Sequence, residues 1–135
     1  MKNAKLTAYV DGGARGNPGP AAAAAVLFSD GKEIGRACSF LQTRTNNQAE
    51  YEAVLLALTE AQKRGAKELE IFSDSELVVN QLNRNYKVKH GGLQPLFVKC
   101  WNAMQSFTRI TIAAIPREKN TVADALVNDT LDKNG

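Results

Sequence analysis

The stretch LTAYVDGGARGNPGPAAAAAVLF, residues 6–28, decides the fold. Apolar and polar residues alternate over its first part, which predicts a half-buried strand over Lys5–Asp11. Glycines and prolines then form a turn, and a second apolar run begins directly after it, so a second strand follows the first. The first strand is therefore expected to end on the carboxylate of Asp11. A charged group at the edge of a core needs a chemical reason.

The rest of the chain adds a third strand and then alternates helices with strands. An Asp30-Gly31 pair predicts a hairpin between the second and third strands, and Thr45 or Asn46 is suited to cap the first helix. The order βββαβααβα predicts an α/β fold with a mixed five-stranded sheet and helices on its faces. The expected elements after the first strand are strands over 21–29 and 32–41, a helix over 43–66, a strand over 68–73, helices over 74–83 and 93–107, a strand over 109–115, and a helix over 121–131 that Asn120 caps.

Length and composition are typical of a globular domain. The chain has 135 residues, of which 44% are hydrophobic and 23% are charged, and this suits one domain with its own core. No apolar run is long enough to span a membrane, and the start lacks the apolar stretch of a secretory signal. We therefore expect a single domain over residues 1–135 that is cytoplasmic, monomeric and without membrane contact.

The two cysteines, Cys38 and Cys100, lack the spacing of a metal site. Free cysteine behaves as a small hydrophobic residue and is among the most buried residue types. We expect both side chains to lie in the core. A disulfide between them is an alternative that the sequence leaves open.

Charge is distributed unevenly along the chain. The formal net charge is only +3, but the segment from Leu77 to Arg117 contains no acidic residue. This basic segment is either a solvated face or a surface that attracts phosphate. Its cations are Arg84, Lys87, Lys89, Lys99, Arg109 and Arg117.

Four acidic residues stand at the ends of predicted elements. Asp11 and Asp74 follow strands, and the carboxyl ends of neighbouring parallel strands meet at one edge of a sheet. Glu50 lies four residues before Val54 and so shares the buried face of its helix, where an uncompensated charge is costly. Asp124 lies in the first turn of the last helix and leans toward its packed side. Each acid alone is explained as a turn residue or a cap, but together they predict one site.

A cluster of four carboxylates needs compensation because like charges repel. Divalent cations supply it, and an all-oxygen ligand set without His or Cys favours Mg²⁺ or Mn²⁺ over zinc. Two such ions about 4 Å apart stabilise an in-line phosphoryl displacement. The chain is therefore expected to bind two ions per site when substrate is present, and no organic cofactor.

Four segments carry a resemblance to a known family: YVDGGARGNPGPAAAA, TNNQAEYEAVLLAL, IFSDSELVVNQL and PREKNTVADALVN. In order and spacing, over nearly the whole chain, they are similar to the type 1 ribonucleases H. The resemblance implies a ribonuclease H-like fold with strand order 3-2-1-4-5. It also implies an endonuclease that hydrolyses the RNA strand of RNA–DNA hybrids by two-metal-ion catalysis, giving 5′-phosphate and 3′-hydroxyl ends.

The resemblance implies roles for individual residues as well. Asp11, Glu50, Asp74 and Asp124 would be the catalytic metal ligands, with Asp11 between the two ions. An RNA–DNA hybrid would be the partner, and 2′-hydroxyl groups would distinguish its RNA strand. Its contacts would be Gly13, Ala14, Asn17, Thr45, Asn46, Asn47, Gln48, Ser75 and Glu76, with Tyr86, Lys87 and Lys89 as a reduced platform for the DNA strand.

The chain departs from the family pattern in two segments. Many members have a histidine in the loop before the last helix, but this loop reads IPREKN, so Arg117 or Glu118 is expected to assist water handling or product release. The single histidine, His90, is expected in another loop. The segment LNRNYKVKHGGLQP is too short for the full basic protrusion of some members, so binding of the hybrid is expected to be modest and salt-sensitive.

Two alternatives keep the fold and change the activity. One is a nucleic-acid-binding or reverse transcriptase-derived module with weak activity, against which the complete set of four acids argues. The other is a nuclease that also cuts duplex RNA. A nucleotide-binding loop at residues 11–19 is a weaker interpretation, because DGGARGNPG has neither the GxGxxG order nor a GK[ST] ending. Its glycines are expected to let the backbone approach nucleic acid, or to form the turn.

Overall fold

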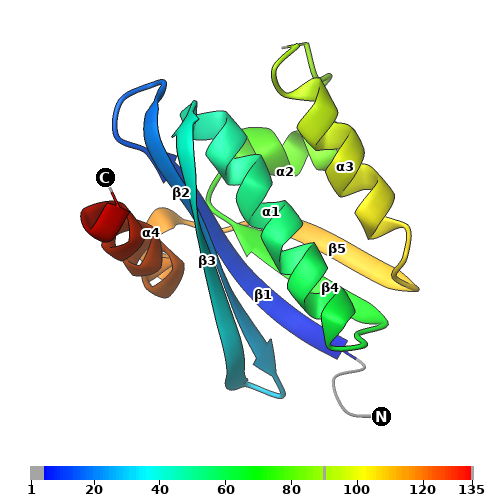
Figure 1. The fold of residues 1–135 in the computed structure, drawn as a ribbon. Helices are drawn as coiled ribbons and strands as arrows, with labels where there is room; N and C mark the ends of the chain where they lie inside the picture. The colour runs from blue at the N-terminus through cyan, green and yellow to red at the C-terminus, as the bar shows by residue number, and fades with distance from the viewer. Residues whose placement is uncertain (1–4, 90, 135) are drawn as a thin grey trace.

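The computed structural model describes residues 5–89 and 91–134, and over these residues the chain forms five strands and four α-helices (Figure 1). The strands form one mixed sheet in the order β3-β2-β1-β4-β5, which confirms the predicted fold. The elements are β1 (Lys5–Ala14), β2 (Gly19–Ser29), β3 (Lys32–Arg44), α1 (Asn46–Lys63), β4 (Glu68–Ser73), α2 (Glu76–Leu82), α3 (Gln94–Met104), β5 (Arg109–Ala114), the short 3-10 turn η1 (Arg117–Lys119) and α4 (Thr121–Asn134).

β1 is the central strand and pairs with a neighbour on each side. It runs antiparallel to β2 and parallel to β4. Pairing with β4 stops at Val10, opposite Ser73, whereas pairing with β2 continues to Ala14. The prediction that the strand ends on Asp11 is therefore wrong, because the ladder with β2 keeps the chain extended beyond it. Asp11 lies where β4, not β1, comes to its end.

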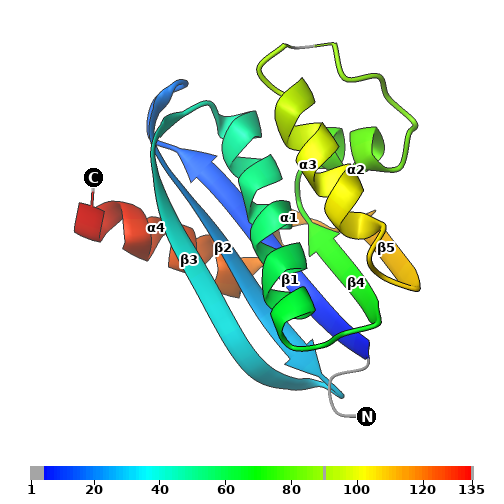
Figure 2. The ribbon, with the colours of Figure 1, turned by 45° about the vertical axis from the view of Figure 1, so that its right-hand side comes forward.

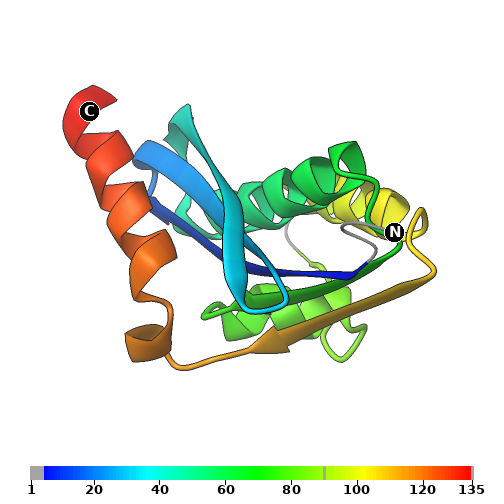
Figure 3. The same cartoon turned by 90° about the horizontal axis from the view of Figure 1, so that it is seen from below.

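The run of alanines in β2 lets helices pack closely on both faces of the sheet. Side chains alternate along a strand, so Ala23 and Ala25 belong to the main core with α1, α2 and α3. Ala22 and Ala24 belong to a smaller core with α4. Figure 3 shows α4 on one side of the central strands and α1 on the other.

The start of α1 is determined by its cap. The Thr45 hydroxyl accepts the Gln48 N–H, and the Gln48 side-chain oxygen accepts the Thr45 N–H, which makes a capping box. Thr45 is therefore the cap, rather than Asn46. α1 then lies alongside α3 across one face of the sheet (Figure 2), and this arrangement directs the first turn of α1 toward the end of β1.

The two cysteines differ in environment. Cys100 is buried in the main core, as predicted. Cys38 is exposed, so the prediction of a core position is wrong for it. The reason is that β3 is an edge strand, and all of its side chains are exposed or half-buried. Both thiols are free. Among the described residues, no helix has the length and apolar content needed to cross a membrane.

Candidate active site

Three acidic side chains converge at the edge of the sheet where β1 and β4 stop pairing. Asp11 lies on β1, Glu50 near the start of α1, and Asp74 directly after β4. One carboxylate oxygen of each residue lies within 4.8 Å of those of the other two. Asp11 and Glu50 are buried, and Asp74 is half-buried. The fold therefore brings together three of the four acids on which the sequence argument depends.

Glu50 reaches this edge because Gly12 has no side chain. The Gly12 N–H donates to Glu50 Oε1 at 2.8 Å. A Cβ at position 12 would overlap the main-chain carbonyl of Ala49 and lie 2.6 Å from the Glu50 nitrogen. The expectation that these glycines form the turn is thus wrong for Gly12, which lies within β1. Its bare backbone lets α1 pack directly against the strand.

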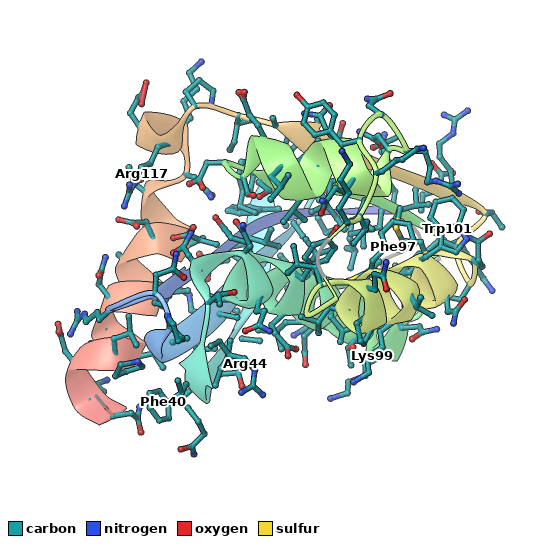
Figure 4. The ribbon with its side chains drawn as sticks, turned by 90° about the horizontal axis from the view of Figure 1, so that it is seen from above. Phe40, Arg44, Phe97, Lys99, Trp101 and Arg117 are labelled. Carbon is teal, nitrogen blue, oxygen red and sulfur yellow. The ribbon has the colours of Figure 1, made fainter. Side chains whose placement is uncertain are left out.

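The fourth acid, Asp124, lines the same hollow but is not one of the three mutually close carboxylates. The hollow has a volume of about 180 Å³ and is lined by all four acids and by Arg117. Asp124 lies in the first turn of α4, and one of its oxygens is 3.6 Å from an Arg117 nitrogen. Figure 4 shows Arg117 on η1, beside the start of α4. Glu118 is exposed on the same turn.

Burial and mutual repulsion make the site hold protons tightly when no cation is bound. Burial, followed by the charges of Asp74 and Asp124, raises the pKa of Asp11 to about 8. Burial, followed by Asp11 and Asp74, raises the pKa of Glu50 well above its ordinary value. The Gly12 N–H and the Arg117 charge lower the pKa of Glu50 in part. The protein itself therefore leaves negative charge here only partly compensated.

The metal-free protein is expected to lose stability as the pH rises from about 4 to about 8. Asp11 binds a proton more tightly in the folded state, with a pKa of about 8 against 3.8 for the ordinary group. The folded state therefore carries more protons than the unfolded state in this window. The stability that protonated Asp11 contributes is complete below pH 4 and is lost toward pH 8. Thermal unfolding in a chelator across this range measures the effect.

The Asp11→Asn variant serves as the comparison for this pH dependence. It should flatten the curve and raise the melting temperature at pH 8 by roughly 5 °C or more, because the repulsion is gone. Asp30→Asn, at the exposed β2–β3 turn, should follow the wild-type curve. Parallel curves for wild type and Asp11→Asn would contradict the prediction.

Asn120 is a residue of the candidate site that the sequence argument missed, since it was expected only to cap the last helix. Its carbonyl does accept the Asp124 N–H at 3.1 Å, but its side chain is bonded outside α4. The side-chain nitrogen donates to the Val10 carbonyl at 2.7 Å and to Asp74 Oδ2 at 3.3 Å. Asn120 is 1% exposed, and its side-chain oxygen has no partner among the described residues. It therefore ties β1, Asp74 and α4 together.

Of the residues expected to contact the RNA strand, Gly13, Ala14 and Asn46 line the hollow. Asn17 Oδ1 accepts the Asn46 N–H at 2.9 Å, and Asn46 Oδ1 accepts the Ala14 N–H at 3.3 Å. These bonds connect the β1–β2 turn to the start of α1. Gly13 and Ala14 are half-buried on β1, beside Asp11.

Other expected contacts are partly used by the protein itself. Gln48 serves the capping box, and its nitrogen lies 3.5 Å from the Gly92 carbonyl, so its side chain is less free than expected. Ser75 caps α2 by accepting the Val78 N–H at 3.3 Å. Thr45 and Gln48 line a second hollow together with Asn17, Asn47, Gly92 and Leu93.

The expected platform residues lie on the loop between α2 and α3. Tyr86 is 52% exposed, so its ring is available for contact with a ligand. Lys87 and Lys89, on the same loop, are exposed as well. Glu76, at the start of α2, is also exposed. His90 lies outside the described residues.

Comparison with known proteins supports the same family from sequence. The model of the family described as reverse transcriptase-like matches residues 9–130. The bifunctional protein Rv2228c of Mycobacterium tuberculosis is 41% identical over 137 residues, which cover 95% of this chain and 36% of that protein. Ribonuclease HI of Halobacterium salinarum is 38% identical over 132 residues, which cover 97% of this chain and 66% of that protein. The chain thus spans about a third of the former relative and about two thirds of the latter.

Solved structures agree with this chain over almost their full length. RNase H1 from the halophilic archaeon Halobacterium salinarum superposes with a TM-score of 0.93 at 38% identity, covering 96% of this chain and 98% of that chain. LC11-RNase H1, isolated from compost and solved in complex with an RNA/DNA hybrid, gives a TM-score of 0.90 at 41% identity, covering 95% and 97%. The chain therefore belongs to the reverse transcriptase-like family, among the type 1 ribonucleases H.

Proposed function

We propose that this protein is an endonuclease that hydrolyses the RNA strand of RNA–DNA hybrids with two divalent cations, giving 5′-phosphate and 3′-hydroxyl ends. The observation that carries the proposal is the convergence of Asp11, Glu50 and Asp74, with ligand oxygens within 4.8 Å of one another, in a chain of this family. The complex of LC11-RNase H1 with an RNA/DNA hybrid supports the substrate class. We further propose that residues 1–135 act as one catalytic domain, cytoplasmic and monomeric, without an organic cofactor.

The donor atoms of the site fit Mg²⁺ or Mn²⁺. All are carboxylate oxygens, which hard divalent cations prefer. The raised pKa values of Asp11 and Glu50 indicate an excess of negative charge that such cations neutralise. Bound by Asp11, Glu50, Asp74 and Asp124, two cations would activate the attacking water and stabilise the leaving 3′ oxygen.

The chain's own contribution is to hold these carboxylates in place before substrate arrives. The Gly12 N–H orients Glu50, and the Asn120 side chain holds Asp74 and the end of the β1–β4 pairing. Gly12 is buried within β1, and Asn120 is buried directly before α4, which limits motion at the site. Preorganisation of this kind lowers the reorganisation needed in the transition state.

Recognition of the hybrid would use the rim of the site. Asn17 and Asn46 are already bonded into position, and amide side chains can both donate to and accept from a 2′-hydroxyl. Tyr86 and Lys87 would face the DNA strand, one against a sugar and the other against a phosphate. Cleavage would then depend weakly on base sequence.

A cleavage assay with labelled RNA–DNA, RNA–RNA and DNA–DNA duplexes tests the proposal. We expect cleavage of the RNA–DNA hybrid with Mg²⁺ or Mn²⁺ and none in a chelator. Analysis of the product ends checks for 5′-phosphate and 3′-hydroxyl. Cleavage of duplex RNA at a similar rate would favour the broader nuclease, and binding without cleavage at any cation would favour the binding module.

Replacement of Arg117 by alanine is expected to lower kcat by roughly threefold to tenfold, with hybrid affinity nearly unchanged. Arg117 is exposed and lies 3.6 Å from Asp124, so its charge contributes modestly to a site that handles phosphate. The matched control is Lys119→Ala, which removes the same charge from the other end of η1. Unchanged turnover and unchanged affinity in Arg117→Ala would remove Arg117 from catalysis.

A further inference from the structure

The segment 83–89, called here the platform loop, has no regular secondary structure and yet is bonded to three different elements. Asn83 Nδ2 donates to the Ile112 carbonyl of β5 at 2.9 Å. Gln94 Nε2, at the start of α3, donates to the Val88 carbonyl at 3.1 Å. Gln81 Nε2, from α2, donates to the Lys87 carbonyl at 3.3 Å. Main-chain N–H groups of residues 83–86 donate to carbonyls of α2, so the first half of the loop is fixed to that helix. Side-chain amides hold the carbonyls of the second half, at Lys87 and Val88.

Gln81 differs from the other two amides because it is buried and bonded at both ends. It is 4% exposed. Its side-chain oxygen accepts the hydroxyl of Tyr51, which is fully buried on α1. Tyr51 directly follows Glu50. A buried primary amide is costly unless its donors and acceptors are used, and the bonds of Gln81 link the helix that carries Glu50 to the loop that carries Lys87.

We propose that Gln81 is a positioning residue for nucleic-acid binding, which holds Lys87 at a fixed position relative to Glu50. The inference rests on the proposed function and deepens it, since the loop would meet the DNA strand while Glu50 meets the RNA strand. The relay from Tyr51 through Gln81 to the Lys87 carbonyl is a buried connection between these two contacts.

The surroundings of the loop suit a nucleic-acid backbone. Arg84 lies over the ring of Trp101, with 5.4 Å between the guanidinium carbon and the ring centroid, and Trp101 stacks on Phe97 at 6.0 Å. With Tyr86 and Lys87 they line a hollow of about 770 Å³. In Figure 4 this aromatic pair lies at the opposite side of the view from Arg117, so a bound duplex would have to span both regions at once.

The physical effect of the relay is on the entropy of binding. Without the relay, Lys87 would have to order when the duplex binds, and that ordering weakens affinity. With Gln81 bonded to both Lys87 and Tyr51, the loop presents its lysine without this cost. Loss of the relay should therefore weaken binding and leave the chemical step almost unchanged.

The test compares the double variant Tyr51→Phe/Gln81→Leu with wild type. Removing both side-chain polar groups together leaves neither side chain with an unmet hydrogen bond, and the Lys87 carbonyl lies on an exposed loop where water can replace its donor, so the fold should be retained. We expect KM for an RNA–DNA hybrid to rise roughly fivefold with kcat within twofold. The matched control is Gln62→Leu. It removes another hydrogen bond made by a side-chain amide, from Gln62 Nε2 of α1 to Ser106 Oγ at 2.8 Å, and should leave KM and kcat unchanged.

Salt dependence and hydrogen exchange separate positioning from general loss of stability. Lys87→Ala should reduce the slope of log affinity against log salt by about one. The relay variant should also show a smaller salt slope than wild type. The rise in KM that it causes should be smaller in a Lys87→Ala background, because both changes act through the same contact. Amides of residues 83–89 should exchange faster in the relay variant than in Gln62→Leu.

The outcomes distinguish this inference from the proposed function. If wild type cleaves hybrids while the relay variant keeps wild-type KM and salt slope, the positioning role is overturned and the function stands. If wild type leaves hybrids uncut, the proposed function fails, and the exchange comparison still decides whether Gln81 holds the loop. A lower melting temperature with unchanged KM and salt slope would show a structural role only.

Discussion

Replacing Asp11 by asparagine is expected to abolish hybrid cleavage, with kcat lower by about a thousandfold or more. Asp11 is one of the two buried acids among the three convergent carboxylates. It also interacts with Asp124 across the hollow. An amide keeps the shape but removes the charge, so it would no longer support the two cations of the proposed mechanism. Single-turnover cleavage with saturating Mg²⁺ measures the loss.

Binding should survive the same change, and this separates chemistry from recognition. The expected hybrid contacts do not include the Asp11 side chain: they lie on β1 beside it, at the start of α1 and on the platform loop. Affinity measured without cleavage should therefore remain within a few-fold of wild type. Asp30→Asn is the matched control, since it makes the same chemical change at an exposed turn and should retain full activity. An Asp11→Asn protein that still cleaves at a tenth of the wild-type rate would refute the assignment of Asp11.

Gly12→Ala is expected to destabilise the fold by about 3 kcal/mol or more, which corresponds to a fall of roughly 10 °C in melting temperature. The added Cβ would meet main-chain atoms of Ala49 and Glu50. Backbone atoms cannot rotate away, so the start of α1 has to move off β1. The same movement displaces Glu50 from the Gly12 N–H, so cleavage should fall as well. Thermal unfolding and activity below the melting temperature measure the two effects.

Gly13→Ala is the stability control for this prediction. A Cβ at position 13 would lie 3.6 Å from a methyl group of Val127 and 3.7 Å from Asn46 Oδ1, which are ordinary contacts. Its melting temperature should stay close to that of wild type. Equal melting temperatures for Gly12→Ala and wild type would show that α1 does not depend on the bare backbone at this position.

Local patterns in the sequence predicted the elements and the directions of their side chains well. Helical periodicity alone placed Glu50 on the buried face of α1, and the structure finds it buried there. The strand over 68–73 and its following acid were predicted at the right positions. Such signals are reliable because periodicity, caps and turns act over a few residues.

Errors arose where a partner from another part of the chain decides the outcome. β1 continues past Asp11 because β2 pairs with it as far as Ala14. Cys38 is exposed because β3 has a neighbour on only one side. In each case the residue's own neighbours in the sequence do not reveal which segments will lie beside it.

By itself, the sequence determined the α/β order of elements and the set of acids that could share a site, because periodicity and residue chemistry are local properties. Only the tertiary structure decided how the site is held together. It set three acids close together and the fourth beside Arg117, it placed Gly12 beneath α1, and it turned the Asn120 side chain toward β1 and Asp74. These are contacts between segments far apart along the chain, and their energies depend on packing that no short stretch contains.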